Sequence, residues 1–163
     1  MKRIKFYLPK EFIMKTFSIL IFINTIGLSS LQAQNSKLGD KQKKDLYTLI
    51  DNYSEARENR DTILLKSIFT SDIDQLVSTG EWRAGIASSV KGMLTSSAGN
   101  PGTRTLTVEK IKVLDKNTSI IDCKYEIQNP NGTTRKMWST FIAVSEKGVW
   151  RISAIRNMLP SGK

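Results

Sequence analysis

The spacing of the apolar side chains changes once along this chain, just after Pro101. Before that point apolar residues recur every three or four positions, as in amphipathic helices, and after it they recur at every second position, as in strands. Four extended runs follow, at 104–114, 118–128, 133–145 and 149–158, joined by short connections rich in turn residues. Short connections pair consecutive strands antiparallel, so the C-terminal half is predicted to be a four-stranded meander.

The third of these runs contains MWSTFIAV, which is apolar on both faces. One face carries Trp138, Ile142 and Val144, and the other carries Met137, Phe141 and Ala143. An antiparallel sheet that is covered on one side only alternates apolar and polar residues. Both faces of this sheet are therefore predicted to be covered, one by helices and the other by a second copy of the chain in a homodimer.

Alternation also assigns individual side chains to faces. In the last run, steps of two residues place five side chains on one face: Trp150, Ile152, Ala154, Arg156 and Met158. In the first run the alternation slips between Val108 and Ile111, which predicts a β-bulge at Glu109 and Lys110. Cys123, the only cysteine, shares a strand face with apolar neighbours and is predicted to be a buried, unreactive thiol.

The segment before Pro101 is predicted to supply three helices and one short strand. The first helix begins at Asp40, and its apolar side contains Leu46, Leu49, Ile50, Tyr53 and Ala56 or Arg57. A second, shorter helix starts at Asp61, whose side chain can cap it. The short strand is QLVST, and residues 80–102 form the third helix and its exit.

The first 33 residues are predicted to be a cleaved secretory signal peptide. Lys15 precedes an apolar stretch of about a dozen residues, which Ser29 and Ser30 follow. A membrane-spanning helix needs roughly 20 apolar residues, so no membrane span is expected. Met14 opens a cleaner signal than Met1 does, which indicates that residues 1–13 are an over-long start.

The remaining chain is predicted to be one domain at 40–160, with a short linker at 34–39 and a tail at 161–163. Its expected location is the periplasm or the outside of the cell, as the signal peptide implies.

Residue types that are missing exclude several classes of site. The sequence has no histidine, which excludes histidine-based catalytic triads and zinc sites. It contains no G-x-G-x-x-G and no P-loop motif, so no metal and no cofactor is predicted. The formal net charge is +10, but the basic residues are interleaved with acidic ones rather than arranged in a stripe, so no nucleic-acid partner is expected.

Four stretches of the chain resemble the nuclear transport factor 2-like superfamily, in its SnoaL-like branch. They are Asp61 within RENRDTILLKSIFTSDI, the segment STGEWRAGIASSVKG, the turn Asn131-Gly132, and the terminal VWRISAIRNM. The resemblance covers roughly 41–160 and implies an α+β fold: N-terminal helices packed on a long, curved antiparallel sheet. In this cystatin-like cone the pocket lies between the concave sheet face and the helices, and members often dimerise through the sheet.

The resemblance marks the fold better than the activity, because this fold hosts isomerases, cyclases, dehydratases and many non-catalytic members. Catalytic members typically place an aspartate or a histidine inside the cone, sometimes with a tyrosine. This chain has no histidine, and none of Asp72, Asp74 and Asp122 matches the position of that base. No catalytic residue is therefore assigned.

Six side chains are predicted to be pocket candidates: Tyr53, Trp82, Tyr125, Trp138, Arg156 and Met158. Arg156 has two interpretations. It can reach the rim of the sheet and pair with a carboxylate such as Glu126, or it can bind a ligand's carboxylate or carbonyl at the pocket mouth. Trp82 and Arg83 either form a lid over the pocket or begin the third helix.

The predicted role is an exported domain that holds a small, largely apolar molecule in the cone. Two alternatives remain: a SnoaL-like enzyme of isomerase or lyase type that uses Tyr53 or Tyr125, and a non-catalytic dimerisation module whose cone is filled by its own side chains. A ligand-sized cavity argues against the filled cone. A carboxylate within hydrogen-bond reach of a tyrosine in that cavity favours the enzyme.

Overall fold

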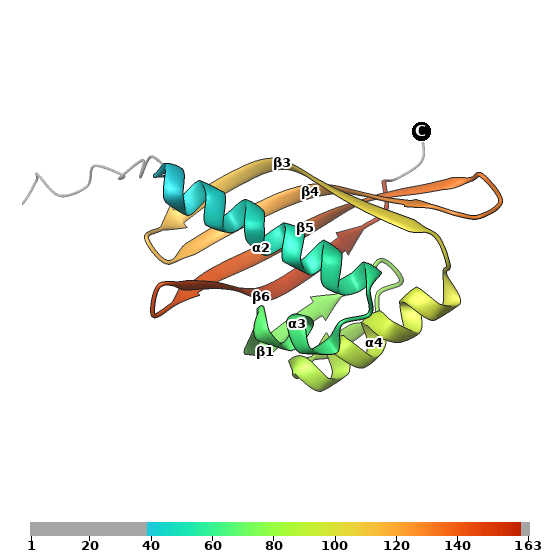
Figure 1. The fold of residues 1–163 in the computed structure, drawn as a ribbon, viewed down its shortest axis with the longest axis horizontal. Coiled ribbons are helices and arrows are strands. Elements are labelled where there is room, and N and C mark those ends of the chain that lie inside the picture. Colours follow the sequence, from blue (N-terminus) through green and yellow to red (C-terminus); the bar gives the residue numbers. More distant parts are fainter. Residues whose placement is uncertain (1–38, 161–163) are drawn as a thin grey trace, which may run out of the picture. The chain divides into compact units, whose positions relative to one another are not determined.

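The computed structural model describes residues 39–160. The predicted signal peptide, most of the linker and the tail lie outside the described residues. The helices are α2 (Asp40–Glu58), α3 (Thr62–Ser67) and α4 (Gly85–Gly99). The strands are β1 (Phe69–Leu76), β2 (Trp82–Ala84), β3 (Thr103–Asp115), β4 (Thr118–Gln128), β5 (Thr134–Glu146) and β6 (Val149–Met158) (Figure 1). Among residues 39–160, no helix combines the length and the apolar character needed to cross a bilayer.

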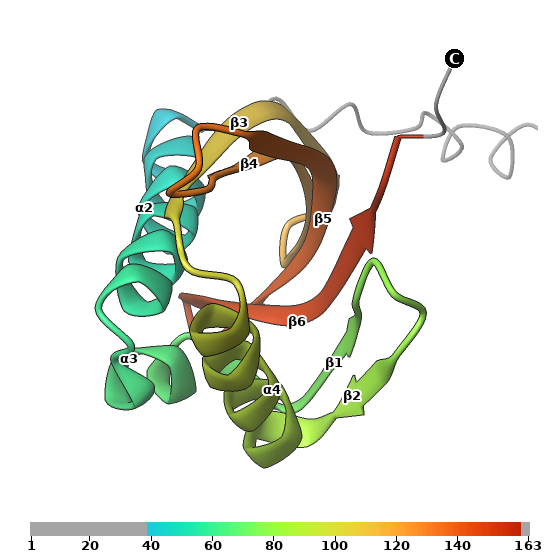
Figure 2. The same cartoon turned by 90° about the vertical axis from the view of Figure 1, so that its right-hand side faces the viewer.

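All strands belong to one six-stranded sheet with the order β2-β1-β6-β5-β4-β3. The predicted meander is confirmed, because β3, β4, β5 and β6 pair antiparallel with their neighbours in sequence. The sheet is mixed rather than wholly antiparallel, since β1 pairs parallel to β6. A parallel pair needs a long connection, and α4 with the first three meander strands supplies it. The sheet curls, and α2 lies across its concave side (Figure 2).

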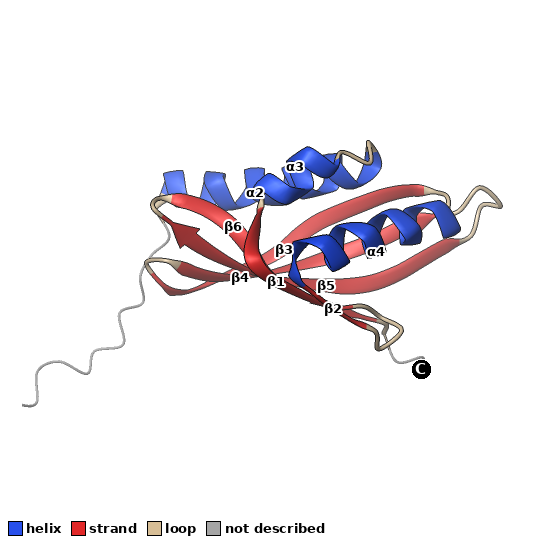
Figure 3. Ribbon diagram, turned by 90° about the horizontal axis from the view of Figure 1, so that it is seen from below, coloured by secondary structure: helices blue, strands red, loops and turns tan. Residues whose placement is uncertain are grey.

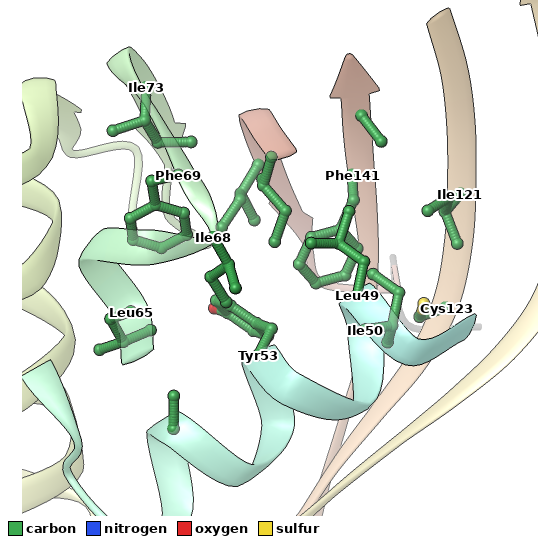
Figure 4. Packing of buried hydrophobic residues seen from close by; sticks show 14 of the residues in the cluster. Leu49, Ile50, Tyr53, Leu65, Ile68, Phe69, Ile73, Ile121, Cys123 and Phe141 are labelled. Atoms are coloured by element: carbon green, nitrogen blue, oxygen red, sulfur yellow. The ribbon is translucent and has the colours of Figure 1, made fainter. Parts of the chain in front are cut away.

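The three helices of residues 39–160 lie on one side of the sheet (Figure 3). α2 buries Leu46, Leu49, Ile50 and Tyr53 at helical spacing. They pack against Phe141 of β5 and against the other apolar residues of one continuous core (Figure 4). Cys123 is fully buried in this core, as predicted, and burial raises the pKa of its thiol to about 12.

Asp61 caps α3, which confirms the predicted start of the second helix. One carboxylate oxygen, Oδ1, accepts hydrogen bonds from the backbone N–H groups of Ile63 and Leu64, each at 2.9 Å. These two donors have no partner inside the helix, so the cap satisfies backbone groups that only water would otherwise pair with at this exposed helix start.

The structure corrects the segment between α3 and α4. β1 begins at Phe69 and includes Asp72 and Asp74, whereas the sequence placed a strand only at QLVST. Trp82–Ala84 forms the edge strand β2, and α4 begins only at Gly85. The sequence did not reveal β2 because a strand of three residues is too short to show an alternation of its own. The helical spacing of apolar residues begins only at Ile86. Gly80 and Gly85 both have positive φ, at 89° and 76°, and they bound this strand.

Two bulges decide which side chains face the helices. The predicted bulge in β3 is confirmed, since Val108 pairs with Cys123 and Lys110 with Asp122, leaving Glu109 unpaired. A second bulge in β6 was not predicted: Ala154 pairs with Ile142 and Ile152 pairs with Ala143, so Ser153 is the extra residue. One extra residue reverses the facing of every side chain that follows it.

The bulge at Ser153 corrects the predicted single face of the last strand. Trp150 and Ile152 share the helix-covered face with Ser145 and Ala143. Beyond the bulge, Ala154, Arg156 and Met158 share the opposite face with Ile142, Thr140 and Trp138. We call this opposite face, which carries Trp82, Trp138, Ala154, Arg156 and Met158, the outer face.

Candidate functional site

A cavity of about 200 Å³ remains between the concave side of the sheet and the ends of α2 and α4. We call it the cone cavity. Its walls come from the last turn of α2, the hairpin that joins β1 to β2, the C-terminal end of α4, and the inner faces of β4, β5 and β6. The lining is both apolar and polar. It includes three arginines: Arg57, Arg83 and Arg135.

Arg57 is a buried cation of the cone cavity that has no carboxylate partner among residues 39–160. It lies in the last turn of α2, and only 7% of its surface is exposed. Its Nη1 donates to the hydroxyl of Tyr53 at 3.1 Å, and its Nη2 donates to Ser97 Oγ at 3.4 Å. Its Nε has no hydrogen-bond partner. No ion pair within residues 39–160 includes Arg57, so its contacts are neutral hydroxyls.

These contacts compensate the charge of Arg57 only in part. Moving an ion out of water costs several kcal/mol in a real protein. The carbonyl end of α2 favours a cation, but this contribution is typically about 0.3–1 kcal/mol. Burial acts to lower the Arg57 pKa, yet Tyr53 and Tyr125 outweigh it and raise that pKa, so the guanidinium stays charged. The cavity wall therefore holds a positive charge whose compensation is incomplete.

Tyr53 positions Arg57 from the same helix. Its ring packs edge-on to Phe141, with the ring centroids 5.0 Å apart, and this packing fixes the direction of its hydroxyl (Figure 4). Burial raises the pKa of Tyr53, and the neighbouring Arg57 offsets only part of that rise. Tyr53 is thus a neutral phenol at physiological pH, and it supports the guanidinium without neutralising it.

Arg83 is the arginine of the cavity whose charge is compensated. Its Nε and Nη2 donate to the two oxygens of Glu81 at 2.9 and 3.1 Å, and its Nη1 donates to Gln75 at 3.4 Å. The hydrogen bonds from Arg83 lower the pKa of Glu81, which keeps this carboxyl ionised. The side chain of Arg83 lies over Gly92 of α4, where a Cβ would overlap the guanidinium.

Arg135 reaches the cone cavity from the start of β5. Its Nη2 donates to Ser78 Oγ at 2.8 Å, which connects the sheet to the hairpin between β1 and β2. It forms no ion pair with any described residue. Strand pairing places it in one row with Ile127 and Arg104, so a further cation lies two strands away on the same face.

The structure separates the six predicted pocket residues. Tyr125 lines the cone cavity, and Tyr53 lies behind Arg57. The other four lie on the outer face: Trp82, Trp138, Arg156 and Met158. Arg156 and Met158 lie on the outer face because the bulge at Ser153 reverses the facing of the residues that follow it. The sequence prediction assumed an uninterrupted alternation along this strand. Trp82 lies in β2 and is not part of the cavity lining, so it does not form the lid that the sequence suggested.

Arg156 forms an ion pair, as its first interpretation held, but with a different partner. It donates from Nη1 and Nη2 to the two oxygens of Asp74 at 2.8 and 3.1 Å. Its guanidinium also lies over the ring of Trp82, 4.8 Å from the ring centroid. Glu126, the partner suggested from the sequence, pairs with Lys136 instead.

Sequence reasoning did not identify Arg57 and Arg135 as site residues, and it considered Arg83 only as part of a lid with Trp82. Arg57 gave the clearest signal, because it stands four residues after Tyr53 on an otherwise apolar helix side. Arg135 gave a weaker one, since it shares the inner face of β5 with Met137. For Arg83 the structure supports neither a lid nor a helix start, because it lies in the three-residue strand β2 and its side chain is part of the cavity wall.

No family model matches this chain, and no curated protein matches it. Solved structures do match. A domain of unknown function with a cystatin-like fold from Nostoc punctiforme aligns with a TM-score of 0.68 at 11% identity, over 76% of this chain and 80% of that chain. A nuclear transport factor 2-like protein of unknown function from Pseudomonas putida aligns with a TM-score of 0.66 at 12% identity, over 77% of this chain and 92% of that one.

A third similar structure is a nuclear transport factor 2-like protein of unknown function from Shewanella oneidensis. It aligns with a TM-score of 0.58 at 15% identity, over 71% of this chain and 98% of that chain. At such identities the similarity concerns the fold alone. The chain therefore has the α+β cone of nuclear transport factor 2-like and cystatin-like proteins, as its sequence predicted.

Proposed function

We propose that this protein binds a small organic anion in the cone cavity, with Arg57 as the group that pairs with the negative charge. The observation that carries the proposal is a guanidinium that is 7% exposed, lines the cavity and has no carboxylate partner among the described residues. Buried charges are normally paired. An anionic ligand would complete the pairing that the chain itself leaves incomplete.

The lining changes the expected chemistry of the ligand. The sequence predicted a largely apolar molecule, whereas the cavity combines apolar groups such as Met137 and Ile127 with charged and hydrogen-bonding ones. A volume of about 200 Å³ is also below the roughly 300–1,000 Å³ of sites for drug-sized ligands. Both features favour a short carboxylic acid with a few carbon atoms over a lipid or a steroid.

The cavity also bears on the two alternatives. A cavity of this size argues against a cone filled by its own side chains. The enzyme alternative called for a carboxylate within hydrogen-bond reach of a tyrosine, and no described carboxylate is hydrogen-bonded to Tyr53 or Tyr125. Tyr53 pairs with Arg57 instead, and Glu81, the carboxylate of the lining, is held by Arg83. Binding without chemistry is therefore the function that we propose. Assignment to the SnoaL-like branch and export from the cell remain predictions from the sequence.

Isothermal titration calorimetry with short carboxylates tests the proposal, for example with butyrate and succinate at constant ionic strength. The wild-type protein is expected to bind at least one of them, and Arg57→Gln is expected to lose that binding at least tenfold. Arg60→Gln is the matched control, because it removes an exposed arginine that does not line the cavity. Equal binding by both variants, or no binding by the wild type, would refute the proposal.

We further propose that the outer face forms the predicted homodimer. The proposal is supported by three large side chains exposed there: Trp82 at 59%, Met158 at 48% and Trp138 at 39%. Aromatic residues, Met and Arg are enriched at protein interfaces, and Arg156 lies on this face beside Trp82. Light scattering after size-exclusion chromatography should give a dimer for the wild type and a monomer for Trp138→Lys, and a monomeric wild type would contradict it.

A further inference from the structure

The charges around the cone cavity indicate how many negative groups its ligand carries. Three arginines line the cavity, and Glu81 is the one carboxylate among its described lining residues. Glu81 is already held by both prongs of Arg83. Two guanidiniums, those of Arg57 and Arg135, are left without a carboxylate in the part of the chain that the structure describes.

These two arginines reach the cavity from different walls. Arg57 comes from the end of α2, and Arg135 comes from the start of β5. Each is steadied by a neutral hydroxyl, Tyr53 for Arg57 and Ser78 for Arg135, so each guanidinium is positioned without being neutralised. Apolar side chains of the sheet, Ile127 and Met137, lie in the same lining. The arrangement offers two cationic points with an apolar surface in the same cavity.

On the basis of the proposed anion-binding function, we propose that the ligand is a short dicarboxylate, with one carboxylate on Arg57 and the other on Arg135. Guanidinium and carboxylate groups match each other as planar, two-pronged partners. The small cavity requires a short chain between the two carboxylates, and the apolar lining suits methylene groups in that chain.

The helix ends at the cavity favour two carboxylates over one phosphate group. Arg57 lies in the last turn of α2, and Ser96 and Asn100 bring the C-terminal end of α4 to the lining. Helix C-terminal ends carry partial negative charge, while phosphate sites are typically built at helix N-termini. Among the described residues, the lining thus contains no helix N-terminus of the kind on which phosphate sites are typically built, and its positive charge comes from separate arginine side chains, which suit two separate carboxylates.

The decisive experiment compares acids of matched length by calorimetry at constant ionic strength. The dicarboxylates succinate, glutarate and adipate are titrated alongside butyrate, valerate and hexanoate, with inorganic phosphate as a further probe. We expect at least one dicarboxylate to bind tenfold or more tightly than the monocarboxylate of equal carbon number. We expect Arg135→Gln to remove that advantage while it changes monocarboxylate affinity by less than about twofold.

The outcomes separate this inference from the function on which it rests. If mono- and dicarboxylates bind equally to the wild type, or if Arg135→Gln keeps the full preference for dicarboxylates, the dicarboxylate inference fails and the anion site at Arg57 stands. Binding of phosphate alone would also overturn the inference. If no probe binds, both proposals fail. Thermal unfolding of each variant, with Arg60→Gln as the control, verifies that the changes are local.

Discussion

Arg57 donates a hydrogen bond to the hydroxyl of Tyr53 across 3.1 Å, one helical turn earlier on α2. The phenol is buried against Phe141 and remains neutral, so it orients the guanidinium without cancelling its charge. A buried ion held by neutral groups is an unfavourable arrangement for stability alone. Its presence in a cavity wall is understandable if a ligand supplies the missing charge.

Removing the charge should therefore stabilise the protein that has no ligand. In Arg57→Met a side chain of similar length replaces the ion, and Tyr53→Phe in the double variant removes the phenol hydroxyl that would lose its partner. We expect the double variant to be as stable as the wild type or more stable by about 1–3 kcal/mol, since apolar replacement of buried ions has effects of this size. Urea unfolding measures the difference. A loss of more than about 1 kcal/mol in the double variant would show that Arg57 serves the fold.

Gly92 should resist substitution although it lies inside a helix. Gly to Ala in a helix interior is normally favourable by roughly 0.5–1 kcal/mol. At Gly92 the new Cβ would overlap the guanidinium of Arg83, so we expect Gly92→Ala to lower stability and to disturb the pair of Arg83 with Glu81.

Two comparisons make this prediction specific. Gly99→Ala in the same helix meets nothing within 4 Å and should be close to neutral. In the background Arg83→Ala, Gly92→Ala should become neutral or stabilising. A thermal shift of equal size in both backgrounds would mean that Arg83 is not the cause.

The cap of α3 should be a local source of stability. Asp61→Ala removes the acceptor of two backbone N–H groups, and losses of such caps cost about 0.5–2 kcal/mol. Asp61→Asn keeps an oxygen in place and should retain most of that stability. Chemical denaturation distinguishes the two variants, and equal losses in both would assign the effect to the charge rather than to the cap.

Cys123 should be protected from thiol reagents in the folded protein. Its thiol is fully buried, and burial raises the pKa from 9.0 to about 12, so the reactive thiolate is scarce at pH 8. We expect negligible labelling by iodoacetamide at pH 8 in the native state and rapid labelling in 8 M urea. Rapid labelling of the native protein would contradict the described packing.

The same thiol predicts a sign for the pH dependence of stability. Between pH 9 and pH 12 the unfolded chain loses the thiol proton while the folded protein keeps it, so this group lowers the free energy of unfolding as the pH rises. Cys123→Ala removes the contribution. Its stability should therefore fall less steeply than that of the wild type over this range, as measured by urea unfolding at a series of pH values.

The sequence predicted the meander well because its strands follow a simple alternation. The slip at Glu109 could be recognised, since two polar residues stand together between Val108 and Ile111. The slip at Ser153 could not, because Ile152, Ala154 and Ile155 are apolar on both sides of it and the alternation continues to look regular. One unrecognised bulge therefore placed Arg156 on the wrong face.

The cavity was harder to predict than the sheet, because its polar groups meet only through tertiary structure. Arg57, Arg83 and Arg135 are far apart in the sequence, and their convergence depends on the parallel pairing of β1 with β6. Local spacing carries no information about that long-range pairing. Tyr125 was found because it shares a strand face with Cys123, which the alternation of β4 shows directly.

The central claim is that Arg57 pairs with an anionic ligand in the cone cavity, and linkage between binding and stability tests it most directly. The free energy of unfolding is measured against the concentration of succinate, at constant ionic strength, for the wild type and for Arg57→Met. A ligand that binds only the folded state adds about 2.7 kcal/mol at a hundredfold excess over its Kd. We predict that the stability of the wild type rises with the logarithm of succinate concentration while that of Arg57→Met stays flat. Equal rises in both proteins would contradict the claim, and so would the absence of a rise in both proteins with succinate and with butyrate in its place.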